Sequence, residues 1–391
     1  SSFRLYDSSV YVYLLRYMTK KHLLLVGAGH AHLETLLALP RIIEAGIKVS
    51  VLNPFQHQYY SGMGPGLLSG TYTPEEVRFD VGAMSRAGGA EFIEERAVRI
   101  LPERRLIVTS SGREIPYDAA SFNIGRVVGG RTVDDSFERV VRVKPVRNLY
   151  TARCRIEEES AEEATGSGEY PLAVIGGGAA GVEIAAALAR LGRRASGIRV
   201  TLASRGTILG AFPPRVRRKA LKKLASLGVR VLEESAVTGN SEEELFLASG
   251  QTVPFRWAFD ATGTRPPGLF RESGLTVGDA GGLLVDSFLK NPEYPELFGG
   301  GDCVDFAPRA LPKVGVYAVR QNPVLRDNLP AFLEGAPLTG FSPQKSHLLI
   351  LNMGDGTGIW YRRPLMFAGS AAFCLKDRID RAFMRRYQVP V

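Results

Sequence analysis

Two glycines that follow a short apolar run could hold a pyrophosphate. The run Leu23–Val26 ends in Gly27 and Gly29, and a helix is expected directly after them. Glycine lets the backbone turn tightly under a phosphate, and the N-terminal end of a helix favours negative charge. His32 stands where the G-x-G-x-x-G pattern has its third small residue, and Asn53 replaces the acid expected on the ribose. Taken alone, this stretch favours a cofactor site and a chance turn about equally.

A second glycine-rich turn repeats the plan with a complete match. Gly176, Gly178 and Gly181 stand in full G-x-G-x-x-G register after an apolar run, and Glu183 and an alanine-rich helix follow. Two such turns about 150 residues apart predict two Rossmann-type domains, one for each dinucleotide.

A third motif connects the two units. The stretch Leu297–Asp305 runs from an apolar strand end into Gly-Gly-Gly-Asp. Asp302 stands where a flavin enzyme places a carboxylate to accept hydrogen bonds from the ribityl chain. A Gly-Asp pair alone is a common turn, but the three motifs in this order are much harder to obtain by chance.

The composition is that of an ordinary globular protein. The chain has 391 residues, of which 45% are hydrophobic and 23% charged, and this length suffices for two or three cores. A net charge of +9 favours anionic partners, such as nucleotide phosphates or an acidic membrane face. The basic residues are dispersed, so we expect no nucleic-acid partner. Three distant cysteines favour a reducing cytoplasm, and no run of about 20 apolar residues predicts a transmembrane helix.

These motifs require an α/β fold with two Rossmann-like domains, the second inserted in the first, and a small C-terminal α+β segment. The acidic and then flexible stretch 157–168 is interpreted as an exposed linker. We expect a hairpin with strands at 348–351 and 359–362, followed by a terminal helix. The expected units are a leader or tag at 1–19, a first dinucleotide-binding domain at 20–145 and 282–340, a second at 146–281, and the C-terminal segment at 341–391.

Further segments are placed to approach a cofactor. The segment 59–70 contains four glycines and a proline, which suits a loop and short helix over a flat ligand, although a plain surface loop would look the same. The predicted strands that end near 125 and 263 also finish in small residues, where a backbone passes close to a ligand. The candidate cofactor-binding residues from these segments and the first turn are His30, Tyr60, Pro65, Gly125 and Gly263.

Seven motifs occur in an order that is familiar from one group of flavoproteins. They read GAGHAH, YSGMGPG, GGGAAGVE, ATG, GGGDC, LPKVGVYAVRQ and KDRIDRAFMRRY. The chain resembles the two-dinucleotide-domain flavoproteins, in the branch of the type II NADH:quinone dehydrogenases and sulfide:quinone reductases. Within that branch it is most similar to the pyridine nucleotide-disulfide oxidoreductase-like proteins that occur alone or fused to selenophosphate synthetase. The resemblance covers nearly everything after residue 20.

This resemblance implies two cofactors, FAD in the first domain and NAD(P)H in the second. The residues implied for FAD are Gly27, Gly29, Asp302 and, through hydrogen bonds to the ribose, Asn53. Those implied for NAD(P)H are Gly176, Gly178, Gly181 and Glu183.

The cysteines depart from the family pattern. Disulfide reductases carry a cysteine pair beside the flavin, and 60–72 contains none. Neither Cys154 nor Cys374 falls in a motif of the sulfide:quinone reductases. We therefore expect neither disulfide nor sulfide chemistry, and five scattered histidines predict no metal site.

The expected chemistry is the flavin's own: hydride passes from NAD(P)H to the ring, and electrons leave to a quinone or another small acceptor. Lys313 resembles the helix-start lysine of the quinone reductases and is expected to stabilise the reduced ring, with a solvated lysine as the alternative. Gln321 is the one glutamine left on the helix that lies by the quinone in type II dehydrogenases, because Val316 occupies the first such position. A non-catalytic or selenium-linked flavoprotein, serving as a redox-state binding module, stays open as the second hypothesis.

The choice of nicotinamide depends on the end of the strand 198–203. Ser204 and Arg205 stand where an acid would exclude a 2′-phosphate, which favours NADPH, although a lone basic residue after a strand is often only solvated. The basic run 215–223 is interpreted as an exposed helix face rather than as a second phosphate site.

The terminal helix, expected at 373–387, has an apolar stripe among basic residues. The stripe consists of Leu375, Ile379, Ala382 and Phe383. Such a helix suits peripheral contact with the cytoplasmic face of an inner membrane. The alternative, slightly favoured, is that the stripe packs on the flavin domain or on a second subunit of a homodimer.

Overall fold

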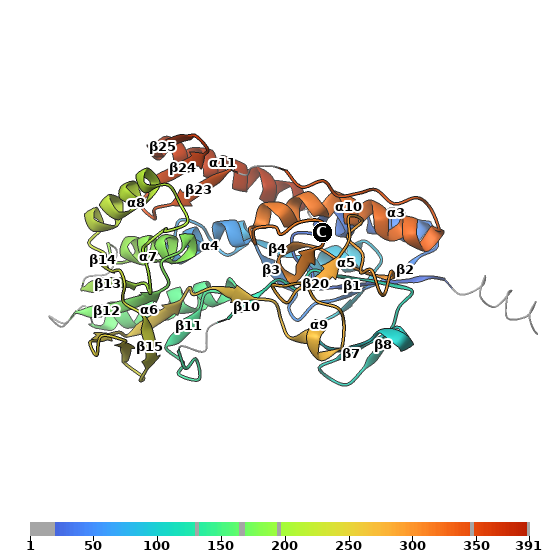
Figure 1. The fold of residues 1–391 in the computed structure, drawn as a ribbon, viewed down its shortest axis with the longest axis horizontal. Coiled ribbons are helices and arrows are strands. Elements are labelled where there is room, and N and C mark those ends of the chain that lie inside the picture. Colours follow the sequence, from blue (N-terminus) through green and yellow to red (C-terminus); the bar gives the residue numbers. More distant parts are fainter. Residues whose placement is uncertain (1–19, 130–132, 164–168, 194–196, 345–347, 389–391) are drawn as a thin grey trace, which may run out of the picture.

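The computed structural model describes residues 20–129, 133–163, 169–193, 197–344 and 348–388 (Figure 1). Two five-stranded parallel sheets form two separate cores, which confirms the α/β fold with two Rossmann-like units. The C-terminal segment lies along one side of both (Figure 1). The predicted leader or tag at 1–19 falls outside the described residues.

The first sheet has the strand order β21-β9-β1-β2-β5, and all its neighbours pair in parallel. Its central strand is completely buried, because both faces of the sheet are covered and neither is left for polar residues. The chain reaches β21 only after it has built the second sheet. The strands are β1 (His22–Val26), β2 (Lys48–Leu52), β5 (Glu91–Ile93), β9 (Ala119–Phe122) and β21 (Leu297–Gly299); the packed helices are α2 (Leu33–Leu37), α3 (Leu39–Glu44), α5 (Val81–Ala87) and α10 (Gly315–Glu334).

The second sheet repeats this arrangement with the order β11-β18-β12-β13-β14, again all parallel. Its strands are β11 (Val140–Arg142), β12 (Tyr170–Ile175), β13 (Ile198–Ala203), β14 (Arg230–Leu232) and β18 (Trp257–Asp260). Its helices are α6 (Arg147–Glu163), α7 (Ala179–Leu191) and α8 (Pro214–Ser226).

Between two successive strands of each parallel sheet, the chain forms a separate three-stranded antiparallel sheet. The first is formed by β6 (Ala97–Leu101), β7 (Leu106–Thr109) and β8 (Glu114–Pro116), and the second by β15 (Val237–Asn240), β16 (Glu244–Leu247) and β17 (Thr252–Pro254). The shorter pairs are β3 (His57–Tyr59) with β4 (Arg78–Asp80), β20 (Leu283–Val285) with β22 (Val304–Phe306), and β10 (Val127–Val128) with β19 (Thr264–Arg265). The short helices are α4 (Gly64–Leu68) and α9 (Leu269–Glu272), with 3-10 turns at Ser61–Met63, Glu75–Val77, Pro102–Arg104 and Gly301–Cys303.

The interpretation of 157–168 as an exposed linker is wrong for 157–163, because these residues form the last turns of α6. Two of their carboxylates have partners, and those of Glu159 lie on or next to strands of the second sheet. Glu157 pairs with Arg153 one turn earlier at 3.0 Å, and Glu159 accepts hydrogen bonds from the Tyr170 hydroxyl at 2.7 Å and from Arg139 at 2.9 Å. Charge alone therefore did not indicate exposure. Residues 164–168 fall outside the described residues.

The C-terminal segment joins the two units. Its hairpin has a third strand that the sequence reading missed, so the sheet consists of β23 (Leu349–Asn352), β24 (Gly358–Arg362) and β25 (Leu365–Gly369). Leu351 and Ile359 are buried in the second core against α7. The following helix, α11 (Ser370–Tyr387), runs along the molecule to the first domain, where Tyr387 enters the first core (Figure 1).

The buried face of α11 is not the predicted stripe. Leu375 and Ile379 are 37% and 44% exposed, while Asp380 and Tyr387 are buried. Phe383 alone of the stripe packs inward, with its ring centroid 4.7 Å from that of Tyr60. Polar contacts decide which face is buried, since Asp380 accepts from the Tyr60 hydroxyl at 3.2 Å. No helix within the described ranges is long and apolar enough to cross a membrane.

Candidate functional site

A large cavity of about 310 Å³ opens at the carboxyl ends of the strands of the first sheet. Parallel strands bring their carboxyl ends to one edge, which is where ligands bind in open α/β sheets. The candidate residues that line it are Gly27, Gly29, His30, Asn53, Gly125 and Asp302. The sequence motifs of the first domain therefore meet in one place.

Asn123, which the sequence reading missed, organises this edge. Its side-chain oxygen accepts from the Ala31 backbone N–H at 2.9 Å, and its amide donates to the Gly300 carbonyl at 2.7 Å. The first glycine turn is thereby tied to the Gly-Asp turn. A Cβ at Gly29 would lie 2.3 Å from the Asn123 side-chain oxygen, so the turn has no room for a side chain. The available sequence signal was the position of Asn123 directly after β9, the strand that pairs with β1.

The two departures of the first turn from its pattern are both accommodated by hydrogen bonds. The buried His32 ring lies 2.6 Å from the Gly27 carbonyl and 2.8 Å from the Ser121 hydroxyl, and it fills the place of the missing small residue. Asn53 accepts from the Ala28 N–H at 3.0 Å and donates to the Phe55 carbonyl at 2.6 Å. Its amide thus holds the turn, and its contact with a ribose stays a prediction.

His30 offers a polar atom with no partner to the cavity. Its Nε2 is buried and unbonded within the described residues, and its ring meets Tyr60 edge-on at 5.2 Å. Burial lowers the pKa of His30 to about 4, so the imidazole is neutral at physiological pH. Tyr60 donates to Asp380 and does not itself line the cavity.

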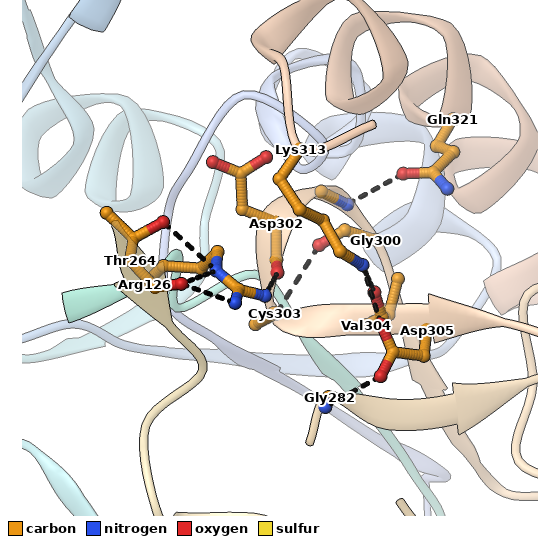
Figure 2. Close-up of polar contacts among 11 residues, drawn as sticks. Arg126, Thr264, Gly282, Gly300, Asp302, Cys303, Val304, Asp305, Lys313 and Gln321 are labelled. Atoms are coloured by element: carbon orange, nitrogen blue, oxygen red, sulfur yellow. Dashed lines mark hydrogen bonds and ion pairs between the residues drawn. The ribbon is translucent and has the colours of Figure 1, made fainter. Parts of the chain in front are cut away.

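Two cations that the sequence reading missed surround Asp302. Lys144, which follows β11 of the second sheet, places its Nζ 3.2 Å from the Asp302 carboxylate. Arg126 donates to the Asp302 carbonyl at 3.3 Å and to the Thr264 carbonyl at 2.6 Å (Figure 2). Lys144 and Arg126 both line the cavity. The ligand site of the first domain is therefore closed partly by residues next to the second sheet.

The two predicted catalytic residues lie beside the Gly-Asp turn but outside the lining of the large cavity. Lys313 donates to the Val304 carbonyl at 2.5 Å and to Asp305 at 2.7 Å. Figure 2 shows its ammonium directed toward Asp305 and away from the Asp302 carboxylate. Gln321 accepts from the Gly301 N–H at 2.7 Å. Both side chains brace the turn, and their direct role in catalysis stays a prediction.

Two further candidates lie away from the cavity lining. Pro65 is buried in α4, and Gly263 accepts from the Gly129 N–H at 2.9 Å beside the β10 and β19 connection. The structure does not bring them to the ligand space of the first domain.

The second glycine turn lies at the carboxyl end of β12. Gly176 has φ +119°, and a Cβ at Gly181 would lie 1.8 Å from the Gly176 carbonyl oxygen, so α7 packs directly on the turn. Gly178 is the N-cap of α7 and has open space where a Cβ would stand. Ser204 is 6% exposed at the end of β13, whereas Arg205 is exposed. This arrangement can present backbone N–H groups and a helix N-terminus to a pyrophosphate.

Glu183 belongs to a cluster where three regions meet. It accepts from the Asn352 N–H at 2.7 Å, and the charge of Lys376 on α11 favours its ionised form. Lys376 donates to the Gly62 carbonyl at 2.6 Å and to Asp380 at 2.5 Å. The cluster joins α7, the C-terminal sheet and the turn before α4. The sequence offered only the Lys376 and Asp380 spacing of four residues as a signal.

The pKa of Glu183 predicts a pH-dependent stability. Burial raises this pKa from 4.5 to about 7, against the opposing effect of Lys376, so the folded protein binds the proton more tightly than the unfolded chain. The stabilisation is complete below pH 4.5 and is lost as the pH rises through 7. Glu183→Gln keeps an acceptor for Asn352 and cannot ionise. We expect it to be more stable than the wild type by about 3 kcal/mol at pH 8 and by less than about 1 kcal/mol at pH 5, measured by urea unfolding. The same pH dependence in both proteins would contradict the assignment.

A family model described as pyridine nucleotide-disulphide oxidoreductase matches residues 21–322. The type II NADH:quinone oxidoreductase of Staphylococcus saprophyticus is 25% identical over 392 residues, which cover 92% of this chain and 94% of the relative.

Two solved structures share the fold over almost the whole chain. The sulfide:quinone oxidoreductase of Aquifex aeolicus superposes with a TM-score of 0.76 at 17% identity, covering 94% of this chain and 91% of that one. NDH2 of Plasmodium falciparum in complex with NADH gives a TM-score of 0.75 at 13% identity, covering 95% and 99%.

Proposed function

The chain belongs to the pyridine nucleotide-disulphide oxidoreductase family, and from this premise we propose that it is an FAD-dependent enzyme that oxidises NAD(P)H and passes the electrons to a quinone. The observation that carries the proposal is the large cavity, which extends from the glycine turn of β1 to Asp302. The quinone as acceptor is supported by the Staphylococcus relative, whose name specifies it.

The residues present fit FAD. Gly27 and Gly29 bring the backbone of the turn to the cavity without side chains, as the close approach of a pyrophosphate requires, and Asp302 can accept hydrogen bonds from the ribityl hydroxyls. The unpartnered Nε2 of the neutral His30 can donate or accept one further bond, according to its tautomer. When bound, FAD supplies the acceptor for the hydride and the donor of electrons. The chain would bind and orient it.

The second turn fits NAD(P)H by the same chemistry. The N-terminal end of α7, capped by Gly178, lies directly after the carboxyl end of β12, as pyrophosphate binding requires. Gly181 keeps α7 close enough to the turn to present them.

The cysteines do not support disulfide or sulfide chemistry. In the part of the chain that the structure describes, the lining of the large cavity contains no cysteine. Cys303 is buried behind the Gly-Asp turn, and burial raises its pKa to about 11, which keeps it a thiol. Flavin-mediated hydride transfer requires no thiol, so the proposal is consistent with this arrangement.

Anaerobic reduction tests the proposal. NADH or NADPH should bleach the yellow colour of the purified protein, and a short-chain quinone should restore it under anaerobic conditions. A redox-state binding module without catalysis would stay yellow or would bleach without reoxidation by quinone. Ferricyanide serves as a second oxidant. If it reoxidises the reduced flavin and the quinone does not, quinone is rejected as the acceptor while NAD(P)H oxidation through FAD still holds.

We propose a preference for NADPH over NADH. Arg205 is exposed at the end of β13, next to the buried Ser204, where a guanidinium can reach a 2′-phosphate. Arg205→Asp is expected to raise the KM for NADPH about tenfold and to change that for NADH less than threefold. Steady-state kinetics with both nucleotides measures the ratio, and an unchanged ratio would remove Arg205 from the site.

We also propose that the C-terminal segment contacts an anionic membrane. Four large apolar side chains on β25 and α11 are exposed, and Figure 1 shows β25 beside the start of α11. Arg362 at the end of β24, Arg363 in the turn before β25 and Arg378 on α11 are also exposed. Together these residues form what we name the C-terminal patch; its apolar members are Leu365 at 65%, Phe367 at 41%, Leu375 at 37% and Ile379 at 44% exposure.

Point variants test the patch better than truncation, because α11 also braces the first domain. Wild-type protein should pellet with vesicles that contain anionic lipid and should be released by salt. The double variant Leu365→Glu/Ile379→Glu is expected to bind at least tenfold more weakly. The control Val98→Glu/Phe246→Glu changes two apolar residues of similar exposure elsewhere. Equal binding of both variants would contradict the membrane contact, and a change of molecular mass in the first variant would assign the patch to a homodimer.

A further inference from the structure

Lys144 and Asp302 form an ion pair across the two domains. Lys144 follows β11 of the second sheet, Asp302 follows β21 of the first, and 158 positions separate them in the chain. Their side chains are 31% and 19% exposed, and both line the large cavity. The adjoining residues Pro145, Val146 and Arg147 also line it, so this segment forms one wall of the ligand space.

The arginines of the cavity lining contact groups other than the Asp302 carboxylate. Arg126 donates to the Thr264 carbonyl and to the backbone carbonyl of Asp302 rather than to its carboxylate. The Arg147 guanidinium lies over the Phe55 ring, 4.2 Å from its centroid, and that of Arg96 lies 5.8 Å from the same ring. Among the described residues of the lining, Lys144 is thus the cation paired with the carboxylate assigned to the ribityl chain.

We propose that Lys144, rather than Lys313, is the cation that stabilises the negative charge of the reduced flavin. The inference rests on the proposed function. The Lys313 ammonium is held by Asp305 and the Val304 carbonyl, outside the lining of the large cavity. The Lys144 ammonium lies in that lining, 3.2 Å from the Asp302 carboxylate that would hold the ribityl chain.

The charge balance explains why a paired lysine suits this position. Hydride transfer moves two electrons and one proton from the nicotinamide to the ring, which gains one negative charge, while the nicotinamide becomes a cation. Before the transfer, Asp302 balances the charge of Lys144 at 3.2 Å. With FAD bound, the ribityl hydroxyls would donate to the Asp302 carboxylate, and the Lys144 ammonium would supply a positive charge for the reduced ring. A fixed charge near a developing charge favours the reduced state.

The ion pair also makes the second domain part of the flavin environment. Because Lys144 stands next to the sheet that carries the NAD(P)H turn, the position of that domain sets the distance between the cation and the ring. Lys144 is a positioning and tuning residue in this proposal, and its effect belongs to the flavin potential rather than to nicotinamide binding.

The experiment compares the midpoint potential of bound FAD in three variants of the holoenzyme. Lys144→Met removes the charge, Lys144→Arg keeps it, and Lys313→Met removes the lysine outside the cavity. Reduction with dithionite and a reference dye makes the readout independent of NAD(P)H. Lys144→Met is expected to bind reduced relative to oxidised FAD about tenfold more weakly, a shift of about 30 mV to more negative potential for a two-electron couple. Lys144→Arg and Lys313→Met should change this ratio less than threefold.

The outcomes separate this inference from the proposed function. A wild-type protein that binds FAD but is not reduced by NAD(P)H would reject the proposed function, while the dithionite titration would still test Lys144. An unchanged ratio in Lys144→Met, or a larger change in Lys313→Met, would overturn the role of Lys144. If Lys144→Met holds FAD weakly, sulfite affinity with FAD in excess gives the same comparison, because sulfite addition also places a negative charge on the ring. Unchanged sulfite affinity would overturn the inference equally.

Discussion

Replacement of Gly29 by valine is expected to give a folded protein that purifies with at least tenfold less FAD per chain than the wild type. The new Cβ would stand 2.3 Å from the side-chain oxygen of Asn123, which must then move. That oxygen accepts from the Ala31 N–H, and the same amide donates to the Gly300 carbonyl. The substitution therefore disturbs the glycine turn and the Gly-Asp turn together. We expect an overpacking cost of about 1–3 kcal/mol, which lowers stability without abolishing the fold.

The flavin absorbance per chain measures this effect, and circular dichroism reports whether the protein is folded. Gly206→Val is the matched control, because Gly206 lies in the second unit and a Cβ there meets no atom within 4 Å. Full flavin occupancy in the Gly29 variant would contradict the assignment of the first turn.

Replacement of Gly181 by valine is expected to leave FAD in place and to prevent its reduction by NAD(P)H. A Cβ at this position would lie 1.8 Å from the backbone carbonyl oxygen of Gly176, and backbone cannot yield as a side chain does. Helix α7 must therefore shift away from the turn, and its N-terminal N–H groups leave the pyrophosphate position. We expect the rate of flavin reduction at a given NAD(P)H concentration to fall at least a hundredfold, about 3 kcal/mol.

Stopped-flow reduction of the flavin measures this rate, and dithionite should still bleach the variant fully. Gly178→Ala is informative beside it, since a Cβ at Gly178 meets no protein atom within 4 Å. A loss of rate in Gly178→Ala therefore reports contact with the nucleotide rather than altered packing. Normal reduction of the Gly181 variant would show that NAD(P)H binds elsewhere.

The parts of the site that could be predicted from the sequence are those encoded locally. An apolar run followed by glycines predicts a buried parallel strand and a tight turn, and both turns are found at strand ends. Asp302 was recognisable because its motif is contiguous, and the structure places it in the same cavity as Gly27 and Gly29. The link to selenium metabolism and the exact domain boundaries stay predictions.

The remaining parts depend on pairs that are distant in the chain. Asn123 meets Ala31 across 92 positions, and Lys144 meets Asp302 across 158, so neither pairing appears in any short window of sequence. For Lys313 the resemblance indicated proximity to the flavin, but the choice of Asp305 as its partner is a side-chain event that no pattern encodes. The predicted buried face of the terminal helix was wrong for a related reason. The periodicity of its sequence predicts a helix, but buried polar contacts determine which face packs inward.

The attachment of α11 to the first domain has a consequence for the order of folding. The Glu34 carboxylate, beside the first glycine turn, accepts from the Tyr387 hydroxyl at 2.7 Å and also pairs with Arg386. These partners are synthesised about 350 residues after Glu34, and β21 also joins the first sheet late. A ribosome thus releases the second domain, whose parallel sheet is contiguous in the chain, before the first can be completed. Contacts of such long sequence separation form slowly. During synthesis the first sheet accordingly remains an incomplete folding unit, and the second domain is the one able to fold first.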